Sequence, residues 1–266
     1  MRDRHPENPS LQLTYVGGPT ALLEFGGLRL LTDPTFDPAG SEYPTPVYVL
    51  RKTQGPAVTS DAIGPIDAVL ISHDHHFDNL DRAGRGVLDV AHSVFTTTAG
   101  AGRLGPRATG LAPWESREIA TRDGRILRVT ATPARHGPAD GDRGPVIGFA
   151  LAFTDAPDRV VYVTGDSVWF EGIAEVARRF APSVVVLFAG AARVREVGPA
   201  HLTFTAAEAV VAARAFARAA IVPMHFEGWA HFSESRPDIE RAFADAGMTE
   251  RLHWPVAGRP MELALS

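Results

Sequence analysis

The sequence has 266 residues, of which 45% are hydrophobic, and its formal net charge at pH 7 is −5. This composition is ordinary for a globular protein, and the mild negative charge argues against nucleic-acid binding through a basic surface. Cysteine is absent, which excludes disulfide bonds, thiolate nucleophiles and cysteine metal ligands.

The N-terminal residues 1–10 are polar and include two prolines, so we expect a loose arm there and no signal peptide. No apolar run approaches the length of a membrane span, which favours a cytoplasmic protein. We expect residues 1–266 to form a single domain, and we expect no nucleic-acid partner. The sequence leaves the oligomeric state open.

Three short apolar runs, at 11–16, 21–25 and 28–31, are separated by glycine turns and predict an antiparallel meander. Asp33 follows the third run and precedes a proline. It would either support a metal-ligating histidine or begin a turn. Residues 34–66 are rich in proline, glycine and threonine and predict a long loop over the functional site.

The most informative stretch follows the apolar run 68–71, which is typical of a buried strand. Residues 73–79 read His-Asp-His-His-Phe-Asp-Asn. A strand that ends in imidazoles and carboxylates brings together ligands that suit zinc and related divalent metals. The alternative is a polar loop with capping groups, but closely spaced histidines beside an aspartate at a strand end favour a metal site.

Two helix or turn regions and one strand follow this cluster. We expect a short helix from Asn79 to Gly84 or Gly86, a strand at 93–97 and a glycine-rich turn region at 100–110. No Gly-Lys-Ser/Thr follows these glycines, so a phosphate-binding loop is not indicated.

Three later strands end in a residue that could bind metal. The strand at 126–131 leads to His136, and the strand at 159–163, the second of a hairpin with 146–153, leads to Asp166. A strand beginning at Ile221 ends in His225. Strand ends that carry such residues can converge on one site.

The C-terminal half also carries helix signals. Apolar spacing at 173, 176, 177 and 180 predicts a helix that Asp166 or Ser167 caps and Pro182 ends, with Ser167 as the cap if Asp166 binds metal. A fully buried strand is expected at 184–188. Thr205 and Glu208 form a capping box for a helix that ends near Ala217. A third helix is expected at 235–246 and an edge strand at 261–265. His201, Trp229 and His231 either contact substrate or pack loops.

Residues 73–79 resemble the His-x-His-x-Asp-His signature of the metallo-β-lactamase fold superfamily. Within it, the sequence is similar to the metal-dependent hydrolases related to lactonases and to N-acyl-phosphatidylethanolamine phospholipase D. His73 and His75 match the first two histidines. Without a gap, Phe77 and Asp78 occupy the Asp and His positions, whereas with one inserted residue Asp78 and Asn79 do. Either alignment makes Asp78 a ligand candidate and loses one histidine.

The resemblance implies an α+β fold, a four-layer αββα sandwich with the metal site at one edge. It implies one or two Zn²⁺ ions, with Mn²⁺ or Fe²⁺ as alternatives. It assigns His73, His75 and His136 to the first metal. It assigns Asp78, Asp166 and His225 to the second metal, with Asp166 bridging.

The implied activity is hydrolysis by a metal-bound hydroxide, with Asp78 and Asp166 as catalytic residues. The substrate would be an ester, lactone or phosphodiester of a small molecule or lipid. Two alternatives stay open, a non-catalytic metal-binding protein and a diiron-type oxidoreductase.

Overall fold

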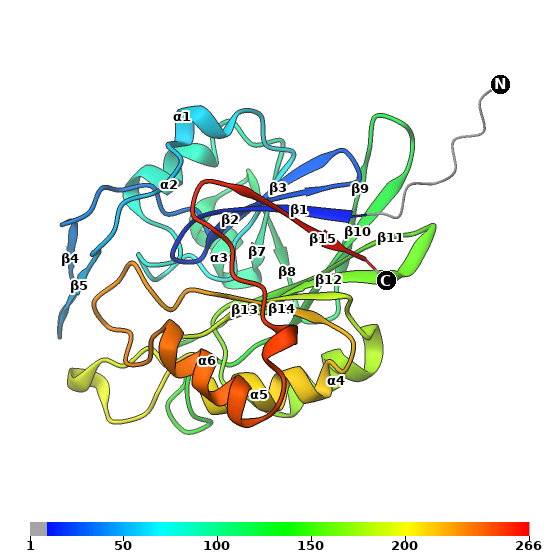
Figure 1. Cartoon of the computed structure of the whole chain (residues 1–266). Helices are drawn as coiled ribbons and strands as arrows, with labels where there is room; N and C mark the ends of the chain where they lie inside the picture. Colours follow the sequence, from blue (N-terminus) through cyan, green and yellow to red (C-terminus); the bar gives the residue numbers. More distant parts are fainter. Residues whose placement is uncertain (1–9, 266) are drawn as a thin grey trace.

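The computed structural model describes residues 10–265, so the expected N-terminal arm lies outside the described residues except for Ser10, which begins the first strand. Two large β-sheets face each other, with helices on the outer side of each (Figure 1). Within the described residues, no helix is both long and apolar enough to cross a membrane.

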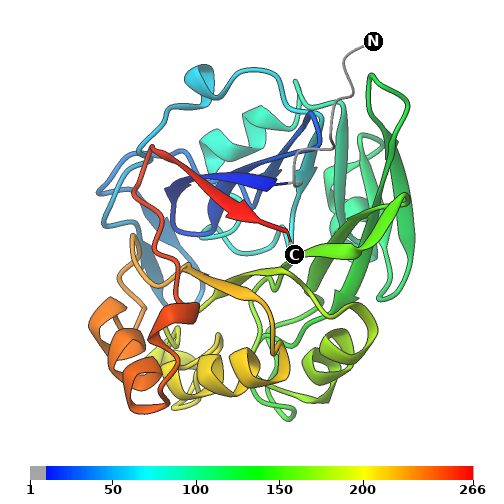
Figure 2. The same cartoon turned by 45° about the vertical axis from the view of Figure 1, so that its right-hand side comes forward.

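The first sheet has seven strands in the order β15-β1-β2-β3-β6-β7-β8. Its strands are β1 (Ser10–Gly17), β2 (Thr20–Phe25), β3 (Leu28–Thr32), β6 (Ala68–Leu70), β7 (Ser93–Thr97), β8 (Ala108–Leu111) and β15 (Pro260–Ala264). The predicted meander is confirmed, since β1, β2 and β3 pair antiparallel. The C-terminal strand β15 lies at the edge beside β1, as expected, and Figure 2 shows the two strands next to each other.

The second sheet has six strands in the order β14-β13-β12-β11-β10-β9. Its strands are β9 (Ser116–Ala120), β10 (Ile126–Pro133), β11 (Ile147–Phe153), β12 (Ala156–Val163), β13 (Val184–Phe188) and β14 (Ala220–Met224). Strands β12, β13 and β14 are parallel, whereas β11 runs antiparallel to both β10 and β12. The C-terminal ends of β10, β12 and β14 therefore lie at the same edge of the sheet.

The alternation of side chains explains the layers. In β13, Val184 and Val186 join the core between the sheets, whereas Val185 and Leu187 pack toward the helices. This strand is buried on both faces, as its continuous apolar sequence predicts.

Helices α4 (Glu171–Phe180), α5 (Ala206–Ala215) and α6 (Arg236–Asp245) cover this second sheet (Figure 1). Helices α1 (Ser60–Ile63) and α2 (Arg82–Val87) contribute to a separate apolar cluster with the first sheet. The predicted four-layer αββα sandwich is confirmed. Two 3-10 turns, η1 (Arg195–Val197) and η2 (Thr249–Arg251), lie in the connections.

The helix ends agree with the sequence in α5 and differ in α4. Thr205 and Glu208 form the expected capping box. The expected cap by Ser167 is wrong, because α4 begins only at Glu171. The Ser167 hydroxyl instead accepts a hydrogen bond from Arg135 N and donates one to Val168 O.

Two regions expected to be loops contain regular structure. Residues 34–66 include a hairpin of β4 (Glu42–Pro44) and β5 (Val49–Arg51) as well as α1. The glycine-rich region 100–110 contains most of α3 (Thr98–Leu104) and the start of β8. A Cβ added at Gly110 would lie 2.8 Å from Thr98 Cα, so this glycine allows close packing of α3 and β8.

Candidate metal centre

The site lies where both sheets end. The chain leaves β3 at Asp33 and β6 just before His73, and these two strands are parallel in the first sheet. His136, Asp166 and His225 follow β10, β12 and β14 of the second sheet. Because these ends meet at one edge of the sandwich, side chains far apart in the sequence come together.

The first group of potential ligands consists of His73, His76 and His136. The Nε2 atoms of His73 and His136 lie 3.0 and 3.2 Å from His76 Nδ1. Two nitrogens that bind one zinc ion tetrahedrally at about 2.0–2.1 Å are about 3.3 Å apart. The spacing of the three nitrogens therefore fits a shared metal ion.

The Nδ1 atoms of His136 and His73 face away from the shared position, and their hydrogen bonds determine which ring nitrogen carries the proton. His136 Nδ1 lies 2.8 Å from Leu202 O, which can only accept, so Nδ1 carries the proton. Ser72 Oγ donates to Asp33 and lies 3.0 Å from His73 Nδ1, which therefore donates to it. Both Nε2 atoms present lone pairs to His76 Nδ1, and one proton there satisfies only one of them. A cation satisfies all three.

The second group consists of Asp78, Asp166 and His225. His225 Nε2 lies 3.3 Å from Asp166 Oδ1 and 3.6 Å from Asp78 Oδ2. The other oxygen of Asp166, Oδ2, lies 3.5 Å from His136 Nε2, so this carboxylate stands between the two groups. Asp166 Oδ2 and His225 Nε2 are buried without a hydrogen-bond partner, which a bound metal would remedy.

The surroundings set the charge of each ligand. Burial lowers the pKa of His73 and His76, in the latter to about 3, and neighbouring imidazoles lower both further. Burial also disfavours a charge on His225, but the carboxylates of Asp166 and Asp78 raise its pKa. His73 and His76 are thus neutral at pH 7, the form that binds metal.

The two carboxylates of the second group are ionised despite their burial. Burial raises the pKa of Asp166 and of Asp78, but nearby histidines reverse this effect. The charge of His225 lowers the pKa of Asp166, and a hydrogen bond from His231 lowers that of Asp78. Both carboxylates therefore present charged oxygens.

One expected ligand is not brought to the centre. His75 turns away, and its Nε2 lies 2.7 Å from Arg143 O. The chain turns after His73, so His76, three residues on, faces the site in its place. This corresponds to the alignment with one inserted residue, in which Asp78 and Asn79 take the last two motif positions. Asn79 Nδ2 lies 3.4 Å from Asp166 Oδ1.

The residues behind the centre hold it in place. Asp33 Oδ1 accepts from Ser72 N at 2.7 Å and from Ser72 Oγ, which links it to His73. This agrees with the supporting role considered for Asp33. His225 has a φ of 54°, a left-handed conformation that costs a non-glycine residue about 1–3 kcal/mol. Its amide donates to Gly18 O, which helps to hold this backbone.

The three expected substrate contacts have different positions. His231 Nε2 lies 3.1 Å from Asp78 Oδ2 and lines the site cavities. Trp229 is buried against Tyr43 and Leu50 of the hairpin, so it packs rather than lines a cavity. His201 Nε2 lies 3.0 Å from Glu208 at the start of α5 and not in the metal cluster.

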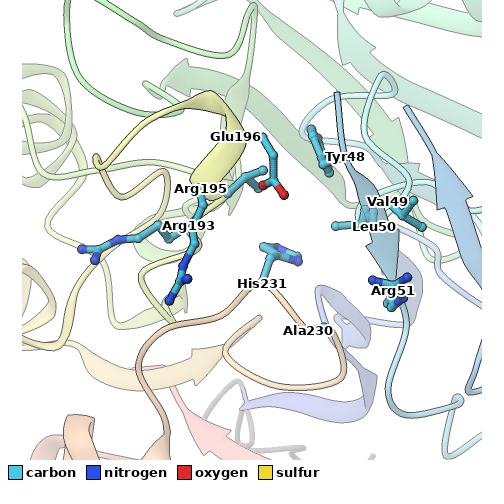
Figure 3. Close-up of a pocket in the computed structure, with 10 residues that line it drawn as sticks. Tyr48, Val49, Leu50, Arg51, Arg193, Arg195, Glu196, Ala230 and His231 are labelled. Atoms are coloured by element: carbon cyan, nitrogen blue, oxygen red, sulfur yellow. The ribbon is translucent and has the colours of Figure 1, made fainter. Parts of the chain in front are cut away.

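Two connected cavities lead to the centre. An inner cavity of about 100 Å³ is lined by His76, Asp78 and His136, and also by Tyr48 and Arg143. It shares residues with an outer cavity of about 500 Å³, in which His231 lies between the hairpin and the segment that carries η1 (Figure 3). Arg143 could not be singled out from the sequence, because an arginine in a loop has no distinguishing pattern.

Comparison with known proteins agrees with this architecture. The chain is 25% identical over 237 residues to a UPF0173 metal-dependent hydrolase of Pyrobaculum aerophilum, covering 86% of this chain and 90% of that protein. The crystal structure of isothiocyanate hydrolase from Delia radicum gut bacteria superposes with a TM-score of 0.80 at 22% identity, covering 95% and 99% of the two chains.

A third similar structure is that of CmlA, a diiron β-hydroxylase from Streptomyces venezuelae, with a TM-score of 0.65 at 17% identity, covering 98% of this chain and 55% of that one. The two structural similarities show a shared fold. The model of a family described as the beta-lactamase superfamily domain matches residues 28–226, more than half of the chain. The protein therefore belongs to the metallo-β-lactamase superfamily.

Proposed function

We propose that this protein is a metal-dependent hydrolase that cleaves an ester, lactone or phosphodiester bond of a small molecule or lipid. The observation that carries the proposal is the pair of buried ligand groups joined by Asp166. Two of their atoms, Asp166 Oδ2 and His225 Nε2, lack the hydrogen-bond partners that buried polar atoms normally have. The relationship to proteins named metal-dependent hydrolases supports the same reading.

The ligand assignment follows from the geometry. His73, His76 and His136 would hold the first metal, and Asp78, Asp166 and His225 the second, with Asp166 shared. With Asp166 shared, the first ion would have four protein ligands and the second three. The second ion therefore keeps a position open for water or substrate, as in catalytic zinc sites. Zinc suits this imidazole and carboxylate set best, and Mn²⁺ or Fe²⁺ also fit it.

A bound dication of this kind polarises a substrate oxygen and lowers the pKa of water from about 15.7 to about 7. Residues of the protein would accept the proton of this water and limit the access of other water to the site. Asp78, ionised and held by His231, can accept a proton from a water molecule at the centre. Leu50, Val194 and Leu202 give the inner cavity apolar walls that limit access of bulk water.

The test is metal analysis combined with an activity panel. The purified protein is assayed against lactone, phosphodiester and phosphomonoester substrates, and against an isothiocyanate because of the similar solved structure. We expect metal-dependent turnover of at least one class. His73→Ala and Asp166→Ala should abolish it, whereas His92→Ala, an exposed histidine, should not. An active, metal-replete His73→Ala/Asp166→Ala double variant would refute the assignment.

The same ligand types also suit iron, so metal identity separates hydrolysis from diiron oxidation. Two zinc ions per chain would favour the hydrolase, and iron would favour the oxidoreductase. A protein that binds metal but hydrolyses none of the panel would favour the non-catalytic metal-binding protein.

A further inference from the structure

Arg143 is a cation at the inner cavity without a counter-charge. Its side chain lines this cavity together with His76, Asp78 and His136. Its Nη2 donates to Val197 O at 2.9 Å, and its Nε is buried without a hydrogen-bond partner. Among residues 10–265, no carboxylate forms an ion pair with it. The buried cation of Lys52, by contrast, is paired with Asp81. The half-buried guanidinium of Arg143 therefore has hydrogen-bonding capacity left for a ligand in the cavity.

The position of Arg143 is fixed by hydrogen bonds on both sides of the residue. Its amide donates to His136 O at 2.8 Å, and its carbonyl accepts from His75 Nε2 at 2.7 Å. His75, which turns away from the metal centre, thus positions the backbone of Arg143. A cation held in this way is ready to receive an anionic group at little cost in conformational entropy.

Tyr48 adds a second donor to the same cavity. It lies at the tip of the β4–β5 hairpin, where Thr45 Oγ1 donates to its carbonyl and accepts from its amide. Within the described residues its hydroxyl has no hydrogen-bond partner. Burial raises the pKa of the phenol, the charge of Asp78 raises it further and that of Arg143 lowers it, so the phenol lies near both.

The outer cavity is less suited to hold an anion, because it also contains carboxylates. Arg51 is already paired with Glu42 at 2.7 Å. In Figure 3, the carboxylate of Glu196 points into this cavity. Within the described residues, the inner cavity has the Arg143 guanidinium without an ion pair and the Tyr48 hydroxyl without a hydrogen-bond partner, both next to the metal centre.

We propose that Arg143 and Tyr48 together bind a negatively charged oxygen of the substrate, a carboxylate or phosphoryl group next to the bond that is cleaved. This inference rests on the proposed hydrolysis and narrows it to acidic substrates. Arg143 supplies charge and two-pronged hydrogen bonding, and Tyr48 supplies a neutral donor. The apolar walls of Leu50, Val194 and Leu202 leave room for a small aliphatic or aromatic body.

The experiment measures binding by calorimetry, not turnover, on the protein as purified, with its metal content determined in parallel. Three probes share one body and differ in charge: (4-nitrophenyl)acetic acid, (4-nitrobenzyl)phosphonic acid and the neutral (4-nitrophenyl)acetamide. We expect the wild-type protein to bind at least one anion about tenfold or more tightly than the amide, since hydrogen bonds to charged groups carry such a preference. The anion that binds more tightly shows whether the substrate carries a carboxylate or a phosphoryl group.

Arg143→Gln should reduce this preference about tenfold or more, and Arg143→Lys should restore part of it. Tyr48→Phe should reduce it by a smaller factor, about two- to tenfold. Arg51→Gln is the matched control from the outer cavity and should keep the preference. Metal content should stay unchanged in all four variants, as none of the exchanged residues belongs to the ligand groups.

A wild-type protein that does not prefer either anion, or that binds none of the probes, overturns the inference. So does a preference that Arg143→Gln leaves intact, because the metal alone would then select the anion. A wild-type protein that hydrolyses none of the substrates, but still prefers an anionic probe through Arg143, would reject the proposed function and not this inference.

Discussion

His75 and His76 are adjacent in the sequence and face different partners. His76 Nδ1 lies 3.0 Å from His73 Nε2, whereas His75 Nε2 lies 2.7 Å from Arg143 O. Because the chain turns between His73 and His76, a spacing of three residues, and not two, puts both rings on the same side. The ligand set is decided by this local turn.

His76→Ala is therefore expected to lose the first metal and to reduce hydrolysis by at least about 100-fold, the upper end of what losing an outer-shell partner costs. His75→Ala should keep both metals and lose activity only through a less ordered Arg143. Elemental analysis and turnover of the two variants provide the measurement. Equal metal loss in both variants would contradict the ligand assignment.

His225 responds to pH differently from His73 and His76. Its pKa lies above the usual 6.5, despite burial, because of the carboxylates of Asp166 and Asp78, whereas the pKa of the other two is lowered. A proton therefore competes with metal at His225 at a higher pH. We expect the second metal to dissociate first as the pH falls through the raised pKa of His225, with the first metal retained.

Equilibrium dialysis against zinc across this pH range counts the bound ions. His225→Ala serves as the control, since it should bind one ion with little dependence on pH in that range. If the wild-type protein loses both ions at the same pH, the two ligand groups do not differ in their sensitivity to protons.

The β4–β5 hairpin is the element that covers the site, and a buried ion pair anchors it. Lys52, the only lysine in the sequence, lies just after β5, and its Nζ is 2.9 Å from Asp81 Oδ2. The side chains of Lys52 and Asp81 are 4% and 0% exposed. Asp81 also accepts from the amides of Phe36, Asp37 and Gly84, so it joins the hairpin's base to the start of α2.

Removing the cation would leave a buried carboxylate without its counter-charge. We expect Lys52→Met to lower the free energy of unfolding by about 3 kcal/mol or more. Arg236→Ala, which breaks an exposed ion pair with Glu240, should change it by less than about 1 kcal/mol. Urea denaturation measures both, and equal stability of Lys52→Met and the wild-type protein would show that the pair does not hold the hairpin.

At the scale of the whole molecule, the metal centre connects the two sheets. His73, His76 and Asp78 follow β6 of the first sheet, and His136, Asp166 and His225 follow three strands of the second. The unfolded chain does not bring these residues together, so metal binds the folded state selectively and stabilises it.

Free zinc at about 100 times its dissociation constant should therefore add about 2.7 kcal/mol to the stability. For a chain of this size, that corresponds to a rise in the thermal midpoint of about 5–10 °C. Calorimetry with and without chelator measures the shift. The thermal midpoint of His76→Ala should rise less on addition of zinc. If zinc does not change the midpoint of the wild-type protein, a metal that links the sheets is excluded.

The sequence predicted most of the elements because their signals are local. The meander, the buried strand β13 and the capping box at Thr205 depend on neighbouring residues only, and all three are confirmed. The hairpin in residues 34–66 was missed, since its stability comes from distant partners such as Asp81 and Trp229. Helix α3 was not predicted because glycines usually indicate turns, whereas Gly100 lies inside this helix, where an added Cβ would be 2.8 Å from Thr96 Oγ1.

By itself, the sequence determined which residue types stand at the strand ends and that they suit a divalent metal, because alternation, glycine turns and ligand chemistry are local properties. Only the tertiary structure decided that His76 and not His75 faces the centre, and that Tyr48 and Arg143 share its inner cavity. These choices depend on the direction of a turn and on contacts between segments far apart in the chain, and the energies that settle them exist only in the packed molecule.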